Sequence, residues 1–232
     1  MKYFFTLYII LHCFTTAFPQ PPAVRSEILS SEEIVKLFPD VVCKALNINF
    51  PIFSIYKYID KTGENYCILT ESSNEITPAK DTMHHQLKAI NVKLINDSLV
   101  KGWEINDKIL TDKDETSIWF WTKYIDFKEY DHDGLVTPII IYGTSAANGY
   151  DDGRIKIIIY YKGRKIAIRH QNGVLDAERE TQVDQTFYDL PKSIQKSIMQ
   201  KMELMTKANE AIFPANWQTA MKNRKTAFNE RN

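Results

Sequence analysis

Alternation of apolar and polar residues predicts a succession of β-strands through the middle of the chain. In segment 86–95, Lys88, Ile90, Val92 and Leu94 share one face, which is the more apolar one. Further strands are predicted at 52–59, 66–71, 101–109, 116–127, 136–142, 154–161 and 164–170. The connections between them are short, which favours an antiparallel meander in which each strand pairs with the next.

Helical signals stand at the two ends of this strand region. Ser30 followed three residues later by Glu33 matches a capping box, and Pro39 ends the first helix. A second short helix is predicted at 41–46. Near the C-terminus the spacing predicts a long helix from 191 to 213, with an apolar stripe of Ile194, Ile198, Met202 and Met205.

Together these patterns predict an α+β fold. It would consist mostly of one antiparallel meander sheet, with a short N-terminal helix and a long C-terminal helix. We expect a single β-rich domain over residues 30–220, preceded by an extended, proline-rich leader at 18–29. The polar segment 221–232 is expected to be a flexible tail.

The first seventeen residues have the pattern of a cleavable signal peptide. Lys2 precedes an apolar run from Tyr3 to Phe14, and small residues precede a cut after Ala17. The alternative is an uncleaved N-terminal anchor, although the run is shorter than the roughly 20 residues that a spanning helix needs. We therefore expect a periplasmic or secreted protein.

The overall charge excludes one class of partner. The chain has 29 basic and 29 acidic residues and a net charge of zero. Because nucleic-acid binding depends on neutralising phosphates with basic side chains, we do not expect a nucleic-acid partner. No second apolar stretch is long enough to span a membrane after signal cleavage.

Export out of the cytoplasm would also decide whether the cysteines are oxidised. Cys13 would leave with the signal peptide, so Cys43 and Cys67 would remain in an oxidising compartment. Two cysteines in that setting predict a Cys43–Cys67 disulfide. The alternative is two buried free thiols that pack as small apolar groups.

An acidic loop between two predicted strands has the spacing of a calcium loop. The candidate oxygen donors are the side chains of Glu129, Asp131, Asp133 and Thr137 and the carbonyl of Leu135. Gly134 would permit the sharp turn, while position 12 of the pattern is Ile140 and the flanks are strands, so the loop is not an EF-hand. The alternative is a metal-free turn held by aspartate side chains.

No catalytic motif accompanies these elements. The sequence contains no metalloprotease, nucleophile-elbow, Walker or dinucleotide-binding pattern, and we therefore expect a protein that is not an enzyme. Aromatic residues on the central strands are the remaining candidates for contact with a protein partner or a glycan, namely Trp103, Trp119 and Trp121. The alternative is that they belong to a large aromatic core.

Several of these segments resemble a known family. Strand 119–127, the loop 130–134 with its Asp-x-Asp-Gly sequence, and strands 137–142 and 155–161 are similar to exported bacterial proteins assigned to surface polysaccharide biosynthesis. The resemblance covers roughly residues 100–215. It implies a process outside the cytoplasm and no particular catalytic residue.

Two functions follow as hypotheses. The first is a periplasmic inhibitor of the immunity type, which binds a protein partner such as a toxin; small exported proteins without catalytic motifs resemble this class. The second is an accessory factor in surface polysaccharide biosynthesis that binds glycan through its aromatic residues.

Overall fold

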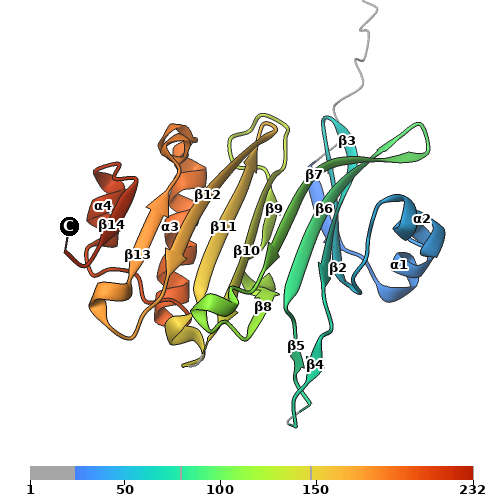
Figure 1. Cartoon of the computed structure of the whole chain (residues 1–232). Helices are drawn as coiled ribbons and strands as arrows, with labels where there is room; N and C mark the ends of the chain where they lie inside the picture. Colours follow the sequence, from blue (N-terminus) through green and yellow to red (C-terminus); the bar gives the residue numbers. More distant parts are fainter. Residues whose placement is uncertain (1–23, 79, 147, 232) are drawn as a thin grey trace, which may run out of the picture.

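The computed structural model describes residues 24–78, 80–146 and 148–231. They form two antiparallel sheets that face each other, with helices on the outer face of each sheet (Figure 1). The five-stranded sheet has the order β1 (Arg25–Ile28), β2 (Ile52–Asp60), β3 (Gly63–Glu71), β6 (Gln86–Ile95) and β7 (Ser98–Lys108). A small hairpin of β4 (Glu75–Ile76) and β5 (Thr82–Met83) extends from it.

The second sheet is built from the later part of the chain. Its order is β14 (Ala227–Asn229), β13 (Glu180–Val183), β12 (Arg164–Gln171), β11 (Arg154–Tyr161), β10 (Thr137–Ser145) and β8 (Ser117–Phe120). The short strand β9 (Asp126–Lys128) also pairs with β10. The link from β7 to β8 carries the chain from one sheet to the other.

Helices cover the two outer faces. The first sheet is flanked by α1 (Ser31–Leu37) and α2 (Asp40–Ala45), and the second by α3 (Lys192–Lys207) and α4 (Trp217–Lys222) (Figure 1). The predicted capping box of α1 is present, because the Ser30 hydroxyl accepts from the Glu33 N–H and the Glu33 carboxylate accepts from the Ser30 N–H.

The core has three parts, one between the sheets and one beneath each pair of helices. The inter-sheet core includes Tyr56, Cys67, Leu69, Ile140 and Ile158. Strands β3 and β10 are buried on both faces along most of their length. This two-sided burial requires a layer on each side of each sheet.

The prediction of one meander sheet with a long C-terminal helix is wrong. The strands divide into two sheets, because β7 and β8 follow each other in sequence without pairing. The helix predicted over 191–213 is only Lys192–Lys207. It ends because Asn209 has a positive φ of 56°, and residues 211–214 then run outside any helix to bury Ala211 and Phe213 against the sheet.

The strand predicted over 116–127 is also interrupted. β8 ends at Phe120, and a 3-10 turn at Thr122–Tyr124 separates it from β9. Trp121, between the two, is buried in the core beneath α3, directly over Gly143 of β10. A Cβ at position 143 would lie 2.5 Å from Cζ2 of Trp121, so the glycine provides the space for the indole.

The chain ends correspond only in part to the sequence-based expectations. Residues 1–17, predicted as a signal peptide, and the first half of the leader, residues 18–23, lie outside the described residues. The second half of the leader contains β1. The segment 221–232, predicted to be a flexible tail, contributes the end of α4 and strand β14, where Phe228 is buried. None of the helices in the described part of the chain has the length and apolar character needed to cross a membrane.

Candidate binding cleft

A cleft opens at one end of the inter-sheet core, where three connections meet. They are the β2–β3 turn, the acidic loop that precedes β10 and the β11–β12 turn. The cleft has a volume of ≈ 310 Å³ and is lined by Tyr58, Asp60, Thr62, Asn65, Trp103, Leu135, Val136, Thr137, Pro138, Tyr160, Tyr161, Lys162 and Gly163. Small-ligand sites are typically of about this size or larger and combine an apolar wall with a few polar groups.

Aromatic rings form the apolar wall. Trp103 of β7 stacks on Tyr160 of β11 with ring centroids 3.8 Å apart and an angle of 11° between the planes. Tyr160 is buried and Trp103 is half-buried, so the indole is accessible from the cleft. Burial raises the pKa of Tyr160 to about 12.

Asp60 holds the connections together. Its Oδ1 accepts hydrogen bonds from the Thr62 N–H at 2.8 Å and hydroxyl at 2.6 Å, and its Oδ2 accepts from the Val136 N–H at 3.2 Å. The Lys61 N–H also donates to the carbonyl of Gly134 at 2.9 Å. The turn of one sheet is thereby fixed to the loop of the other, which gives the cleft a defined shape.

The acidic loop is paired with lysines. Lys162 lies 2.9 Å from Asp133 and 3.7 Å from Asp131, and the ammonium of Lys61 donates to the carbonyl oxygen of Asp133. The Tyr161 hydroxyl donates to Asp131 at 2.7 Å. Burial acts to raise the pKa of Asp133, but the Lys162 hydrogen bond and further contacts outweigh it and keep that pKa below its usual value.

The acidic side chains of the predicted calcium loop thus lie beside cations of the protein itself. The Lys162 ammonium pairs with the side chains of Asp131 and Asp133, which are two of the predicted donors, and the Lys61 ammonium donates to the main-chain carbonyl of Asp133. A positive charge there competes with Ca²⁺ for the carboxylates. Thr137 lies beyond the turn, in β10, opposite Lys128. Within the turn, the Leu135 N–H donates to the Asp133 carboxylate and the Gly134 N–H donates to the Glu129 carboxylate. No group of three His, Cys, Asp or Glu among the described residues is placed to hold a metal ion. The loop is held as a lysine-paired turn.

The predicted disulfide is not present. Cys43 and Cys67 are free thiols, and the Cys43 thiol donates to the carbonyl of Phe38 at 3.2 Å. Cys67 points into the inter-sheet core, whereas Cys43 belongs to α2 and packs against the core on the other face of the same sheet. The sheet itself therefore separates the two sulfur atoms.

The three tryptophans predicted to contact a partner do not share a surface. Trp103 lies at the cleft, while Trp119 and Trp121 pack on the opposite face of the second sheet, in the core beneath α3. Trp121 is buried and Trp119 is half-buried. Trp103 is thus the one of the three that lies at a candidate binding site.

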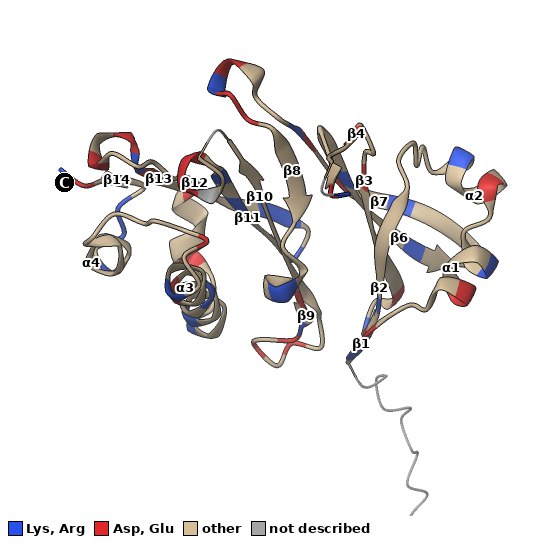
Figure 2. Ribbon diagram, turned by 90° about the horizontal axis from the view of Figure 1, so that it is seen from below, with Lys and Arg blue, Asp and Glu red and all other residues tan. Residues whose placement is uncertain are grey.

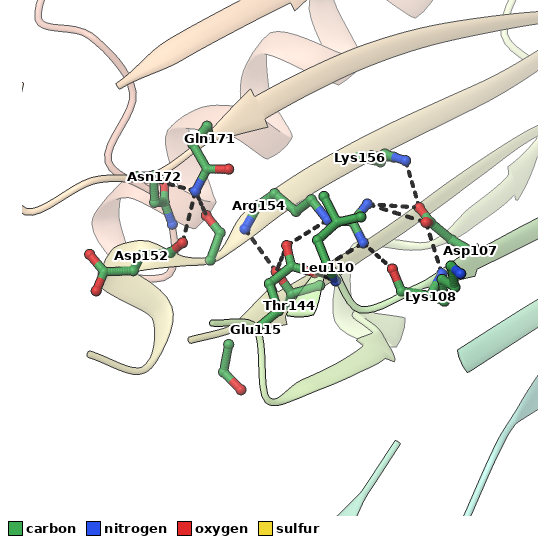
Figure 3. A network of polar contacts seen from close by, with 12 residues as sticks. Asp107, Lys108, Leu110, Glu115, Thr144, Asp152, Arg154, Lys156, Gln171 and Asn172 are labelled. Carbon is green, nitrogen blue, oxygen red and sulfur yellow. Dashed lines mark hydrogen bonds and ion pairs between the residues drawn. The ribbon is translucent and has the colours of Figure 1, made fainter. Parts of the chain in front are cut away.

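The other end of the inter-sheet region carries a buried ionic network (Figure 3). Arg154 of β11 donates to Glu115 at 2.6 Å and to both oxygens of Asp107 at 3.1 and 3.2 Å, and also to the carbonyl of Lys108. The Thr144 hydroxyl donates to Glu115 at 3.0 Å. The guanidinium is saturated with contacts within the protein, so this network ties the sheets together.

Most of the residues that line the cleft carry no signal in the sequence. Tyr58, Asn65 and Tyr160 occur in ordinary strand patterns, and only the pairing of the sheets brings them beside Trp103. The Asp-x-Asp-Gly loop and Trp103 were the two sequence signals near the site. Comparison of the chain with models of protein families, with curated proteins and with solved structures found no match.

Proposed function

We propose that this protein is a non-catalytic binding protein whose end cleft holds a short segment of carbohydrate. The observation that carries the proposal is the half-buried Trp103, stacked on Tyr160 at the wall of a cleft with a polar rim. Aromatic side chains provide large, rigid contact surfaces for ligands, and the C–H groups of a sugar ring pack against such faces.

The polar rim suits the hydroxyl groups of a sugar. Thr62, Asn65 and Lys162 line the cleft and offer a hydroxyl, an amide and an ammonium group. Thr62 lies in the β2–β3 turn that Asp60 holds, Asn65 belongs to β3, and Lys162 lies in the β11–β12 turn, so a ligand would meet donors and acceptors that are already positioned. Preorganisation of this kind reduces the entropic cost of binding.

A binding role agrees better than catalysis with the chemistry of the cleft. Both oxygens of Asp60 are engaged in hydrogen bonds that hold the turns. The Tyr58 hydroxyl accepts a hydrogen bond from Asn91, and burial raises the pKa of Tyr58 far above its usual value. Asp60 and Tyr58 therefore use their polar atoms to stabilise the structure of the cleft. A role in surface polysaccharide biosynthesis, which the family resemblance implies, would use such a site to hold glycan.

The test is a titration of the protein with soluble oligosaccharides prepared from bacterial surface polysaccharide, followed by calorimetry. Trp103→Ala is expected to weaken binding about tenfold, because an aromatic contact contributes ~0.5–1.5 kcal/mol beyond the area it buries. Asn65→Ala is expected to weaken binding as well.

Trp119→Ala is the matched control, because Trp119 belongs to the second sheet and packs on its outer face, beneath α3 and away from the cleft. It is expected to leave the affinity unchanged, with circular dichroism confirming the fold of each variant. Absence of binding to every oligosaccharide, or binding that Trp103→Ala does not weaken, would contradict the proposal.

A further inference from the structure

A second surface lies on the outer side of the seven-stranded sheet. Helices α3 and α4 lie side by side there, as the two views of the molecule show (Figures 1 and 2). Between them, and beside the turn at Gln185–Asp189, is a groove of ≈ 720 Å³. Its apolar lining consists of Phe187, Tyr188, Met199 and Met221.

The rim of this groove is basic. Four cationic side chains and one acidic side chain line it, namely Lys192, Lys196, Lys222, Arg224 and Glu203. Arg224 is paired with Asp189 at 2.8 Å. Lys196 and Lys222 are exposed and form no ion pair with any other described residue. These two ammonium groups, one on each helix, are available to a ligand.

We propose that this groove docks an amphipathic α-helix of a partner protein, with acidic residues on both sides of its apolar stripe. A third helix lying along the groove between two helices is a common recognition mode, with anchors at i, i+3, i+4 and i+7. The basic side chains come from both walls, α3 and α4, so acidic groups are needed on both flanks of the ligand. A single lipid headgroup would instead need the cations gathered at one place.

The groove is independent of the carbohydrate cleft. The cleft lies between the sheets, and the groove lies on the outer face of the second sheet. Both could be occupied at once, and either proposal can fail without the other. A protein partner at this groove agrees with the hypothesis of an exported inhibitor.

The probe is a fluorescein-labelled peptide of about 18 residues, with leucines at helical anchor positions and glutamates beside them. A second peptide has lysine in place of each glutamate. Fluorescence anisotropy is expected to show at least about tenfold tighter binding of the acidic peptide. Lys196→Glu combined with Lys222→Glu is expected to abolish this preference.

The control exchanges two exposed lysines away from the groove, Lys36→Glu with Lys113→Glu, and is expected to retain the preference. Equal binding of both peptides, or equal loss in the control variant, would overturn the proposal. So would binding to phosphatidylglycerol vesicles that depends on Lys196 and Lys222 without any preference for the acidic peptide, because that result would assign the groove to a lipid headgroup.

Discussion

Arg154 and Asp107 join the two sheets through a bidentate pair, with Nη1 of Arg154 3.1 and 3.2 Å from the two carboxylate oxygens. Arg154 belongs to β11 of one sheet and Asp107 to β7 of the other. The same guanidinium also neutralises Glu115, whose side chain is 1% exposed. The contact thus fixes how the sheets are placed at the end of the inter-sheet region opposite the cleft.

Replacement of Arg154 by methionine is therefore expected to destabilise the fold strongly. Glu115 would be left buried without its cation, and breaking a buried pair in this way costs about 3–5 kcal/mol. Urea unfolding followed by circular dichroism measures the loss. Arg169→Met, at an exposed ion pair with Asp184 on the same sheet, is the control and is expected to cost no more than about 1 kcal/mol. An equal loss of unfolding free energy in the two variants would show that the buried Arg154 pairs stabilise the fold no more than an exposed ion pair does.

His170 is expected to make stability depend on pH. It is buried, with Nε2 2.8 Å from Asn172 and Nδ1 2.9 Å from Thr181, and burial lowers its pKa from 6.5 to about 4. Above pH 6.5 the imidazole is neutral in both states. Between pH 6.5 and 4 only the unfolded chain gains the proton, so the free energy of unfolding falls as the pH falls, by on the order of 3 kcal/mol.

Unfolding measured at several pH values tests this dependence. His170→Asn is expected to remove most of the slope between pH 6.5 and 4, whatever its effect on stability at neutral pH. The exposed His132 provides the control, and His132→Asn is expected to leave the slope in place. An unchanged slope in His170→Asn would assign the dependence to other groups.

Calcium is expected to leave the melting temperature unchanged. Lys162 and Lys61 already pair with the acidic loop, so a divalent cation would have to displace both. Asp131→Asn with Asp133→Asn is expected to lower stability by no more than about 1 kcal/mol, because Lys162 is exposed. The measurement is the melting temperature of the protein and of the double variant, with and without calcium. A calcium-dependent rise that the double variant loses would support the predicted calcium site.

The two thiols are expected to differ in reactivity. Cys67 is fully buried and Cys43 is half-buried, and burial raises the pKa of both thiols. A maleimide reagent should label Cys43 slowly in the native protein and Cys67 only in denaturant, because the thiolate is the reactive form. Mass spectrometry of peptides prepared without reductant locates the labels. A Cys43–Cys67 disulfide in those peptides would show that the oxidised protein differs from this structure.

Local patterns were sufficient for much of the secondary structure. The strands at 86–95 and 154–161 were predicted to the residue, and the capping box at Ser30 was found from its spacing alone. These features depend on neighbours in the chain, which is why the sequence determines them. The extent of α3 did not follow from the pattern, because the segment after Asn209 leaves the helix to fill the core.

The division into two sheets was decided by tertiary structure. Apolar residues on both faces of a strand show that it is buried, but they do not show which strand lies opposite. The same limit explains the two cysteines, which are near each other in sequence but on opposite faces of one sheet. The cleft, too, depends on how the two sheets pack against each other. Trp103 and Tyr160 stack only because β7 and β11 belong to different sheets that face each other, and this contact between distant segments leaves no local pattern in the sequence.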